Sequence, residues 1–289
     1  MLAIYKREAG SYFKGVLGYA LCAFFTAISA LYFVVYNLVG GYGSFSYYTL
    51  YYTTIVFLLF VPILTMRSFA EEHRSKTDQL LLTSPVPLGG IVAGKFLAVA
   101  TVYAVPCVID CVMAAVLPFF GGQYLVSDLA GILCYFLMGC AAISVGIWCS
   151  AQTENPVLAA VFSFVTLLVS YFMPSIRSMF AVGDLVSLLV MAVLVLGVAV
   201  LVGIRSRSLT TGCVAFSLGS FGLIVLYQFR SAWLTTAFTA VLEALCLFTP
   251  FEECINGAYT LTAPVYYITV TALFLFLTAQ TLEKRRWNG

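Results

Sequence analysis

The sequence predicts an all-α integral membrane protein, a polytopic bundle with about eight spans. Hydrophobic residues make up 62% of its 289 residues and charged residues only 9%, whereas about a quarter of a soluble domain is charged. The mean hydropathy is +1.03, and apolar runs recur at roughly the 20-residue length that crosses a bilayer core. The net charge of +2 gives no general attraction to nucleic acid, so no nucleic-acid partner is expected.

The expected spans follow directly from the apolar runs, and their number lies between six and eight. The run at 210–227 is short and rich in Gly and Ser, which leaves seven spans as an alternative. The eight runs are 17–39, 47–66, 94–118, 128–150, 156–174, 184–204, 210–227 and 262–282.

The basic residues predict the orientation, because short cytoplasmic loops are enriched in Lys and Arg. With eight spans and both termini inside, 12 of the 14 basic residues lie on the cytoplasmic side, and only Arg177 and Arg230 lie outside. The chain is therefore expected to be a multi-pass protein of the cell (plasma or inner) membrane, with residues 1–289 forming a single transmembrane domain.

Residues 1–16 precede the first span and predict an interfacial helix. Leu2, Tyr5, Ala9 and Tyr12 recur at helical spacing, which is typical of a helix lying on the membrane surface. The alternative is a charged tail that only obeys the positive-inside rule.

The cytoplasmic loop at 67–93 is the most informative stretch. Glu72 with Lys76 and Arg74 with Asp78 are i, i+4 pairs that favour a helix. Proline residues that follow the helix then end it. A short charged helix fixed between two spans suits docking into a groove of a soluble partner, and the alternative is a solvated loop. The face of this helix that is expected to be exposed and semi-apolar holds Phe69, His73, Thr77 and Leu80.

Asp110 in the third span and the external segment before the last span are two further candidate sites. Asp110 lies at membrane depth in the third span, where an acid is costly. A polar contact between helices is favoured over a proton or substrate site.

The external segment 228–261 holds an apolar stretch, 242–251, that is too short to cross and predicts a re-entrant hairpin. Three roles stay open for this segment: it lines the exit of a transport path, it contacts an extracytoplasmic partner, or it caps the membrane surface without a ligand. A disulfide between Cys246 and Cys254 is left open, because spacing alone cannot show it. The candidate residues of the external hairpin are Glu243, Glu252, Glu253 and Gly257.

Nothing in the sequence predicts catalysis or a bound metal. The stretch from Gly89 to Phe96 resembles a phosphate-binding loop, but Phe96 replaces the hydroxyl residue and no strand precedes it. The single histidine, His73, is cytoplasmic, and the nine cysteines show no C-x-x-C spacing. The chain is therefore not expected to be an enzyme or to bind a cofactor itself.

Three stretches resemble the type-2 ABC transporter permeases, in the branch of the gliding-motility (Gld) and nitrous-oxide-reductase accessory (Nos) permeases. They are PILTMRSFAEEHRSKTDQLLLTSPVP with the following GKFLA, the C-terminal TLEKRRW, and the N-terminal YKREAGSYF, which is similar to the elbow helix of that family. The middle, 156–227, matches only in hydropathy, and many such permeases have six spans.

The resemblance implies a coupling helix at about 69–80 that docks on a separate cytoplasmic ATP-binding subunit, which holds the ATP and Mg²⁺. It further implies a second permease copy or a related permease, and it allows an accessory membrane protein with an extracytoplasmic domain. The contact candidates carried over are Phe69, Ala70, Glu71, Glu72, His73, Arg74 and Thr77.

Three functions remain open at this point. The first is the permease of an ATP-driven exporter of an amphipathic substrate, since few polar groups lie inside the spans. The second is a mechanotransmitting or assembly module that moves no solute. A secondary transporter or channel is disfavoured, because such proteins show several intramembrane ionisable sites and Asp110 is alone.

Overall fold

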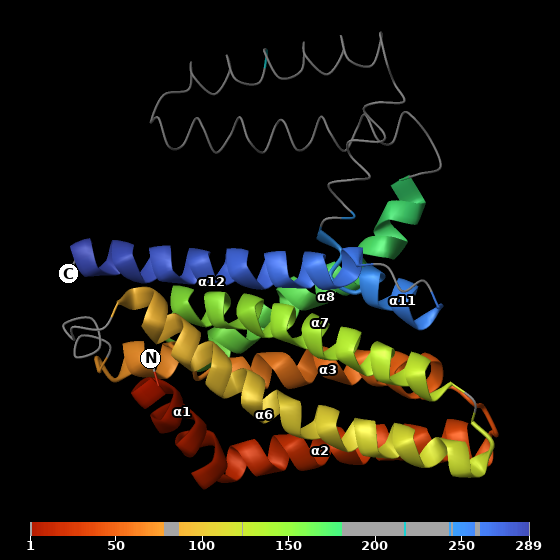
Figure 1. The fold of residues 1–289 in the computed structure, drawn as a ribbon. Helices are drawn as coiled ribbons and strands as arrows, with labels where there is room; N and C mark the ends of the chain where they lie inside the picture. The colour runs from red at the N-terminus through yellow and green to blue at the C-terminus, as the bar shows by residue number, and fades with distance from the viewer. Residues whose placement is uncertain are drawn as a thin grey trace. The chain divides into compact units, whose positions relative to one another are not determined.

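The computed structural model describes residues 2–77, 87–122, 124–180, 217, 243, 245–257 and 261–288. The chain divides into two compact units, residues 1–169 with 247–289, and residues 170–246. The described part contains helices and no strand (Figure 1), which confirms the predicted all-α class.

Six helices of the described residues are long and apolar enough to cross a membrane. They confirm six of the predicted spans, while those at 184–204 and 210–227 lie outside the described residues. The six are Val16–Val39, Ser46–Arg74, Leu88–Phe120, Leu125–Gln152, Pro156–Ser175 and Thr262–Arg286.

The first two spans change helical pitch at one end. Helix α2 (Val16–Tyr32) continues as the π-helical η1 (Phe33–Val39), and π-helical η2 (Ser46–Leu50) continues as α3 (Tyr51–Thr65). The buried amide of Asn37 donates to the carbonyls of Tyr42 and Ser44 at 2.8 and 2.9 Å. These bonds fix the turn that reverses the chain, which an apolar run alone does not predict.

The remaining spans are continuous helices. Helix α6 (Leu88–Val116) ends in the 3₁₀ turn η3 (Leu117–Phe120), and α7 (Leu125–Gln152), α8 (Pro156–Phe180) and α12 (Thr262–Asn288) follow. Pro87 precedes α6 with an extended backbone, a conformation that is favoured where a helix begins.

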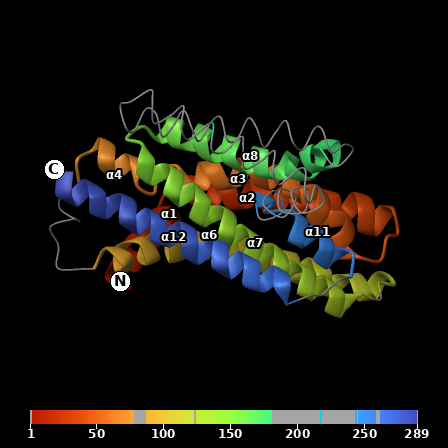
Figure 2. The same cartoon turned by 90° about the horizontal axis from the view of Figure 1, so that it is seen from above.

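Helix α7 lies at the centre of the larger unit, in contact with α3, α6, α11 (Thr249–Ile255) and α12, as Figure 2 shows for α6 and α12. Glycine lets neighbours approach it closely. A side chain at Gly139 would overlap the buried Tyr103 ring, and one at Gly146 would overlap Thr65. Small residues in these positions are typical of helix packing inside membranes.

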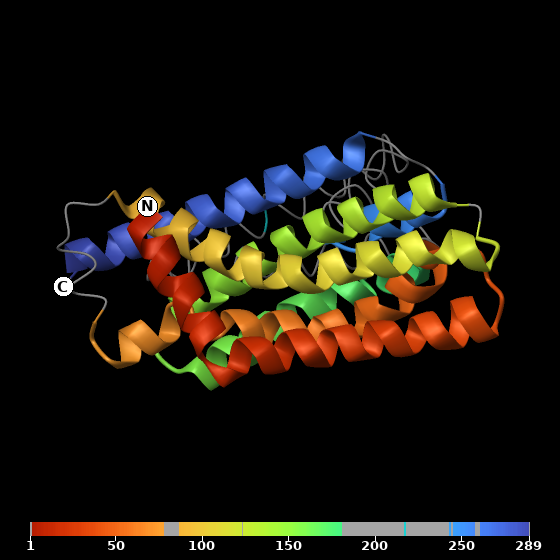
Figure 3. The ribbon, with the colours of Figure 1, turned by 60° about the horizontal axis from the view of Figure 1, so that its bottom comes forward.

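Helix α1 (Leu2–Lys14) runs at an angle to α2 and packs against α6, as Figure 3 shows. Tyr5 and Thr101 share a hydrogen bond at 3.2 Å, and the Tyr12 hydroxyl donates to the Leu64 carbonyl at 3.1 Å. Burial raises the pKa of Tyr12. The N-terminal segment is therefore a packed helix rather than a charged tail.

Both termini lie at the same end of the bundle (Figures 1 and 3). This end also holds the basic residues of α1 and of the last turn of α12. The positive-inside rule makes it the cytoplasmic end, and the opposite end, with η1, η2 and α11, is called the outer end below.

Candidate functional site

The connection between α3 and α6 forms a short cytoplasmic helix, α4 (Ala70–Arg74). Within the described residues α4 ends at Arg74, before Lys76, which adopts a left-handed backbone with φ of 57°. The last part of the predicted helix, 78–80, lies outside the described residues. The Ser75 hydroxyl donates to the carbonyls of Glu71 and Glu72 at 2.9 and 3.2 Å. These bonds supplement the backbone hydrogen bonds that the same two carbonyls accept from the N–H groups of Ser75 and Thr77.

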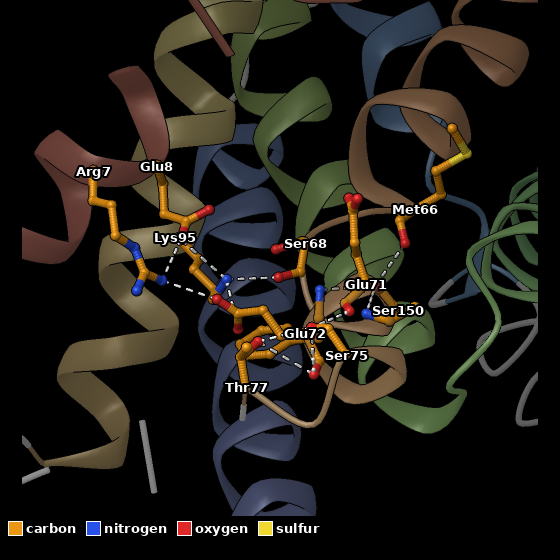
Figure 4. Close-up of polar contacts among 12 residues, drawn as sticks. Arg7, Glu8, Met66, Ser68, Glu71, Glu72, Ser75, Thr77, Lys95 and Ser150 are labelled. Carbon is orange, nitrogen blue, oxygen red and sulfur yellow. Dashed lines mark hydrogen bonds and ion pairs between the residues drawn. The ribbon is translucent and has the colours of Figure 1, made fainter. Parts of the chain in front are cut away.

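The beginning of α4 is capped by a residue from another span. Ser150 of α7 accepts hydrogen bonds from the backbone N–H groups of Phe69 and Ala70, each at 3.1 Å, and donates to the Met66 carbonyl at 3.1 Å (Figure 4). A helix normally takes this cap from its own chain just before its first turn. Here Phe69 occupies that position and has no polar side chain, so α7 supplies the hydroxyl.

One face of α4 is buried in the larger unit. Phe69, Ala70 and His73 are all buried, and the Phe69 and His73 rings stack with centroids 6.2 Å apart. The sequence predicts an exposed semi-apolar face through Phe69 and His73. In the structure this face turns inward, because burying the two rings removes their apolar surface from water, which is favourable.

An ion-pair network beside the Phe69 ring joins α1, α4 and α6. Lys95 of α6 is only 1% exposed, and its Nζ lies 3.0 Å from Glu72 Oε2 and 3.3 Å from Glu8 Oε1. It also donates to the Ser68 carbonyl at 2.6 Å and lies 5.0 Å from the centre of the Phe69 ring. A buried ammonium group needs several such partners.

Arg7 closes the network from the solvent side (Figure 4). Its Nη2 lies 2.6 Å from Glu8 Oε1 and 2.9 Å from Glu72 Oε1, and the hydrogen bond to Glu8 raises the pKa of Arg7. Glu72 therefore pairs with Arg7 and Lys95, whereas the i, i+4 spacing predicts a pair with Lys76. Two cations and two carboxylates balance one another across three helices.

The other face of α4 is exposed. The Glu71 side chain is 60% exposed and lies 4.0 Å from Arg67, and Arg74 and Thr77 are exposed as well. Beside it a cleft of about 950 Å³ separates α1 from the α3–α6 connection. Its polar lining includes Arg7, Ser11, Arg67, Glu71 and Thr77.

The seven candidates from the loop thus form three groups. Phe69, Ala70 and His73 face the bundle, Glu72 lies between two helices, and Glu71, Arg74 and Thr77 face outward. Sequence reasoning missed Lys95, Glu8 and Ser150. A lysine inside the first turns of an apolar span was a signal for Lys95, whereas nothing in the sequence pointed to Ser150.

Asp110 is fully buried in α6 and accepts a hydrogen bond from Ser29 of α2 at 2.5 Å. It therefore makes a polar contact between two spans. The described residues contain no group of three or more ligating side chains that could hold a metal ion.

Of the external segment 228–261, the structure describes 243, 245–257 and 261, which include α11. The rest lies outside the described residues, so the re-entrant hairpin stays a prediction. Phe251 is buried against Tyr135 of α7, with ring centroids 5.3 Å apart, and Gly257 ends the helix with φ of 90°. Glu253 is exposed and Glu252 half-buried.

Cys246 and Cys254, whose pairing the sequence leaves open, are both free thiols. The Cys254 sulfur lies 2.9 Å from that of Cys134. Helix packing brings residues from α11 and α7 together, which sequence spacing could not show. Glu243 is described and lies in the smaller unit.

Comparison with known families gives one match. Residues 40–185 match the family described as ABC-2 family transporter protein, and neither a curated protein nor a solved structure matches. The matched range includes α4, the α3–α6 connection and the capping residue Ser150. Members of this family are membrane subunits that lie in a multi-pass arrangement and work with a separate ATP-binding subunit. The chain therefore belongs to the ABC-2 family and is the permease subunit of an ABC transporter.

Proposed function

We propose that this permease couples ATP hydrolysis by a cytoplasmic ATP-binding subunit to export of an amphipathic substrate, and that α4 is the coupling helix. The observation that carries the proposal is the position of α4. It is fixed to α7 through Ser150, to α6 through the Lys95–Glu72 pair and to α1 through the Arg7–Glu72 pair, while its opposite face meets solvent.

The exposed face is the proposed docking surface. Glu71, Arg74 and Thr77 contact the ATP-binding subunit, and the adjacent cleft of about 950 Å³ receives part of it. The charges on this face are of both signs, which suits a partner groove with complementary charges. Phe69 and His73 act from inside by positioning α4, not by contacting the partner.

The ion-pair network supports transmission of a displacement from α4 to the neighbouring helices. Because the cap and the ion pairs join α4 to α1, α6 and α7, displacement of α4 moves the cytoplasmic ends of these helices together. Dense packing passes such displacement on rather than absorbing it. A second permease copy or a related permease completes the transporter, and an accessory membrane protein is a further proposed partner.

The experiment exchanges the charges of the docking surface and leaves the buried network unchanged. The tagged chain is purified from native membranes in mild detergent, and co-purifying chains are identified for wild type and for the double variant Glu71→Arg, Arg74→Glu. Glu253→Lys, at the outer end, is the matched control. Thermal unfolding of all three confirms that they are folded.

The proposal expects an ATP-binding subunit with wild type and with the control, and a loss of at least tenfold from the double variant. Equal retention of the ATP-binding subunit by all three proteins would show that α4 is not part of the interface. A chain that purifies without any ATP-binding subunit would favour a secondary transporter. Retention with ATPase activity, but without substrate movement in vesicles, would favour the mechanotransmitting alternative.

A further inference from the structure

A second cavity lies at the outer end, between the beginning of the second span and α11. Its volume is about 220 Å³, which is below the 300–1,000 Å³ of typical drug-sized sites. It suits a ligand fragment the size of a small head group. The residues that line it are Tyr47, Tyr48, Tyr51, Tyr52, Glu252, Ile255 and Asn256.

The aromatic rings form walls that face different directions. Tyr47 and Tyr48 lie edge to face, with centroids 5.0 Å apart and planes at 73°, and Tyr51 and Tyr52 do the same at 5.5 Å and 80°. Rings at such angles surround a ligand from more than one side, whereas parallel rings offer it one surface. This is the arrangement of an aromatic cage.

Two of the four rings are held from behind by other tyrosines. Tyr42 stacks on Tyr48 at 4.2 Å and 17°, and Tyr36 stacks on Tyr52 at 4.6 Å and 8°. Stacking restricts the rotamers of Tyr48 and Tyr52 before any ligand arrives. Less conformational entropy is then lost on binding.

Glu252 supplies the only carboxylate among the residues lining this cavity, and none of those residues is basic. The sequence contains no Lys or Arg between Arg230 and Lys284. Glu252 is half-buried, and burial raises the pKa of its carboxyl. A bound cation would remove the cost of keeping this carboxylate ionised there.

We propose that this cavity binds a quaternary, trimethylated ammonium group between its tyrosine walls and Glu252. Ring faces carry negative charge and attract cations, so an anion is excluded by both the rings and the carboxylate. A quaternary, fully methylated ammonium has no N–H groups that need acceptors, so it fits against ring faces better than a primary amine does. The site needs no ATP-binding subunit, so it stands or falls independently of the proposed coupling mechanism.

The cation has two sources, a lipid head group or a free solute. Tyrosines at a membrane interface lie at head-group depth, and this cavity lies beside the beginning of a span. Both sources present the same trimethylammonium chemistry, and the experiment distinguishes them.

The test uses the purified chain in a non-ionic detergent, with choline chloride as the probe and sodium chloride at equal ionic strength as the reference. Binding is measured by isothermal titration calorimetry and by the thermal shift. The neutral analogue 3,3-dimethylbutan-1-ol has the same shape without the charge. The variants are Glu252→Gln and Tyr52→Leu, with Glu253→Gln as the matched control one residue away.

Choline is expected to bind wild type and the Glu253 variant alike, and to lose at least tenfold in affinity with Glu252→Gln and with Tyr52→Leu. The neutral analogue should bind at least tenfold more weakly than choline. Equal binding by Glu252→Gln, equal binding of the neutral analogue, or no choline binding by wild type would overturn the proposal.

The source follows from native mass spectrometry of protein taken from nanodiscs. Retained phosphatidylcholine that Glu252→Gln loses identifies a lipid site. Choline binding that is unchanged in phosphatidylcholine nanodiscs identifies a solute site. Either result supports the cage, and retention of phosphatidylglycerol equal to that of phosphatidylcholine would count against it.

Discussion

Replacing Lys95 with methionine tests the buried network directly, because the stem is kept and the charge removed. The 1% exposed ammonium has three partners, the carboxylates of Glu8 and Glu72 and the carbonyl of Ser68. Removing one member of a buried ion pair costs about 3–5 kcal/mol. Glu8 and Glu72 retain 16% and 17% exposure and still contact Arg7, so we expect the lower end, about 3 kcal/mol.

The assay is thermal unfolding of the purified chain in a non-ionic detergent. A change of 1 kcal/mol shifts Tm by about 2–4 °C in chains of this size class, so Lys95→Met should lower Tm by about 6 °C or more. Arg7→Gln is the control. Its side chain is 55% exposed, and loss of an exposed pair costs about 1 kcal/mol or less.

A second signature separates charge imbalance from lost packing. Adding Glu8→Gln and Glu72→Gln to Lys95→Met removes the uncompensated carboxylates and should recover part of the lost Tm, since neutral replacement of a whole buried network is often tolerated. If Lys95→Met unfolds within about 2 °C of Arg7→Gln, a difference of 1 kcal/mol or less, the network does not stabilise the cytoplasmic end and the reasoning is refuted.

Four further outcomes are expected. Ser150→Ala leaves two N–H groups of α4 without their acceptor and should cost about 1–2 kcal/mol, measured as Tm. Lys76→Gly, at a residue with φ of 57°, should stabilise by about 0.5 kcal/mol, also measured as Tm. Oxidation of the intact chain by diamide, which is reduced to its hydrazine, should join Cys134 to Cys254 with loss of two hydrogens, because their sulfurs lie 2.9 Å apart; non-reducing peptide mapping detects the link. Choline affinity should fall as pH is lowered through the raised pKa of Glu252, because the protonated carboxyl no longer attracts the cation, and calorimetry across pH follows this loss.

Three of these outcomes have a control. Ser144→Ala removes a hydroxyl that donates only within α7 in the described structure, to the Ala141 carbonyl, and it should change Tm less than Ser150→Ala does. Cys246 should stay unlinked to Cys254 under diamide. Glu252→Gln should flatten the pH dependence of choline binding, and a slope that persists in this variant would assign the titration to another group.

The spans could be predicted from sequence because membrane crossing is a local property: an apolar run of sufficient length satisfies it in any fold. The pitch changes of η1 and η2 were not predictable in this way, since they depend on bonds such as those of Asn37. The candidate site was located by charge pattern, but its orientation was not. Helical spacing groups Phe69 with His73, and only the packed neighbours α6 and α7 decide that this face turns inward.

The ion pairs show the same limit. Glu72 has a suitable partner four residues away in Lys76, yet it pairs with Arg7 and Lys95, which are distant in sequence. Local spacing predicts ion pairs only within one helix, whereas a buried lysine pairs with the carboxylates that the fold places close to it. Asp110 and Ser29 met across two spans for the same reason.

Helix α7 carries a contact with each end of the transporter. Ser150 caps α4 at the cytoplasmic end, and Tyr135 packs on Phe251 of α11 toward the outer end. Fifteen residues separate these two positions along one helix, which is about 22 Å. The helix contains no proline between them, so we expect it to move as a rigid rod: a tilt imposed at α4 would move α11 in the opposite direction, without any change inside the helix itself.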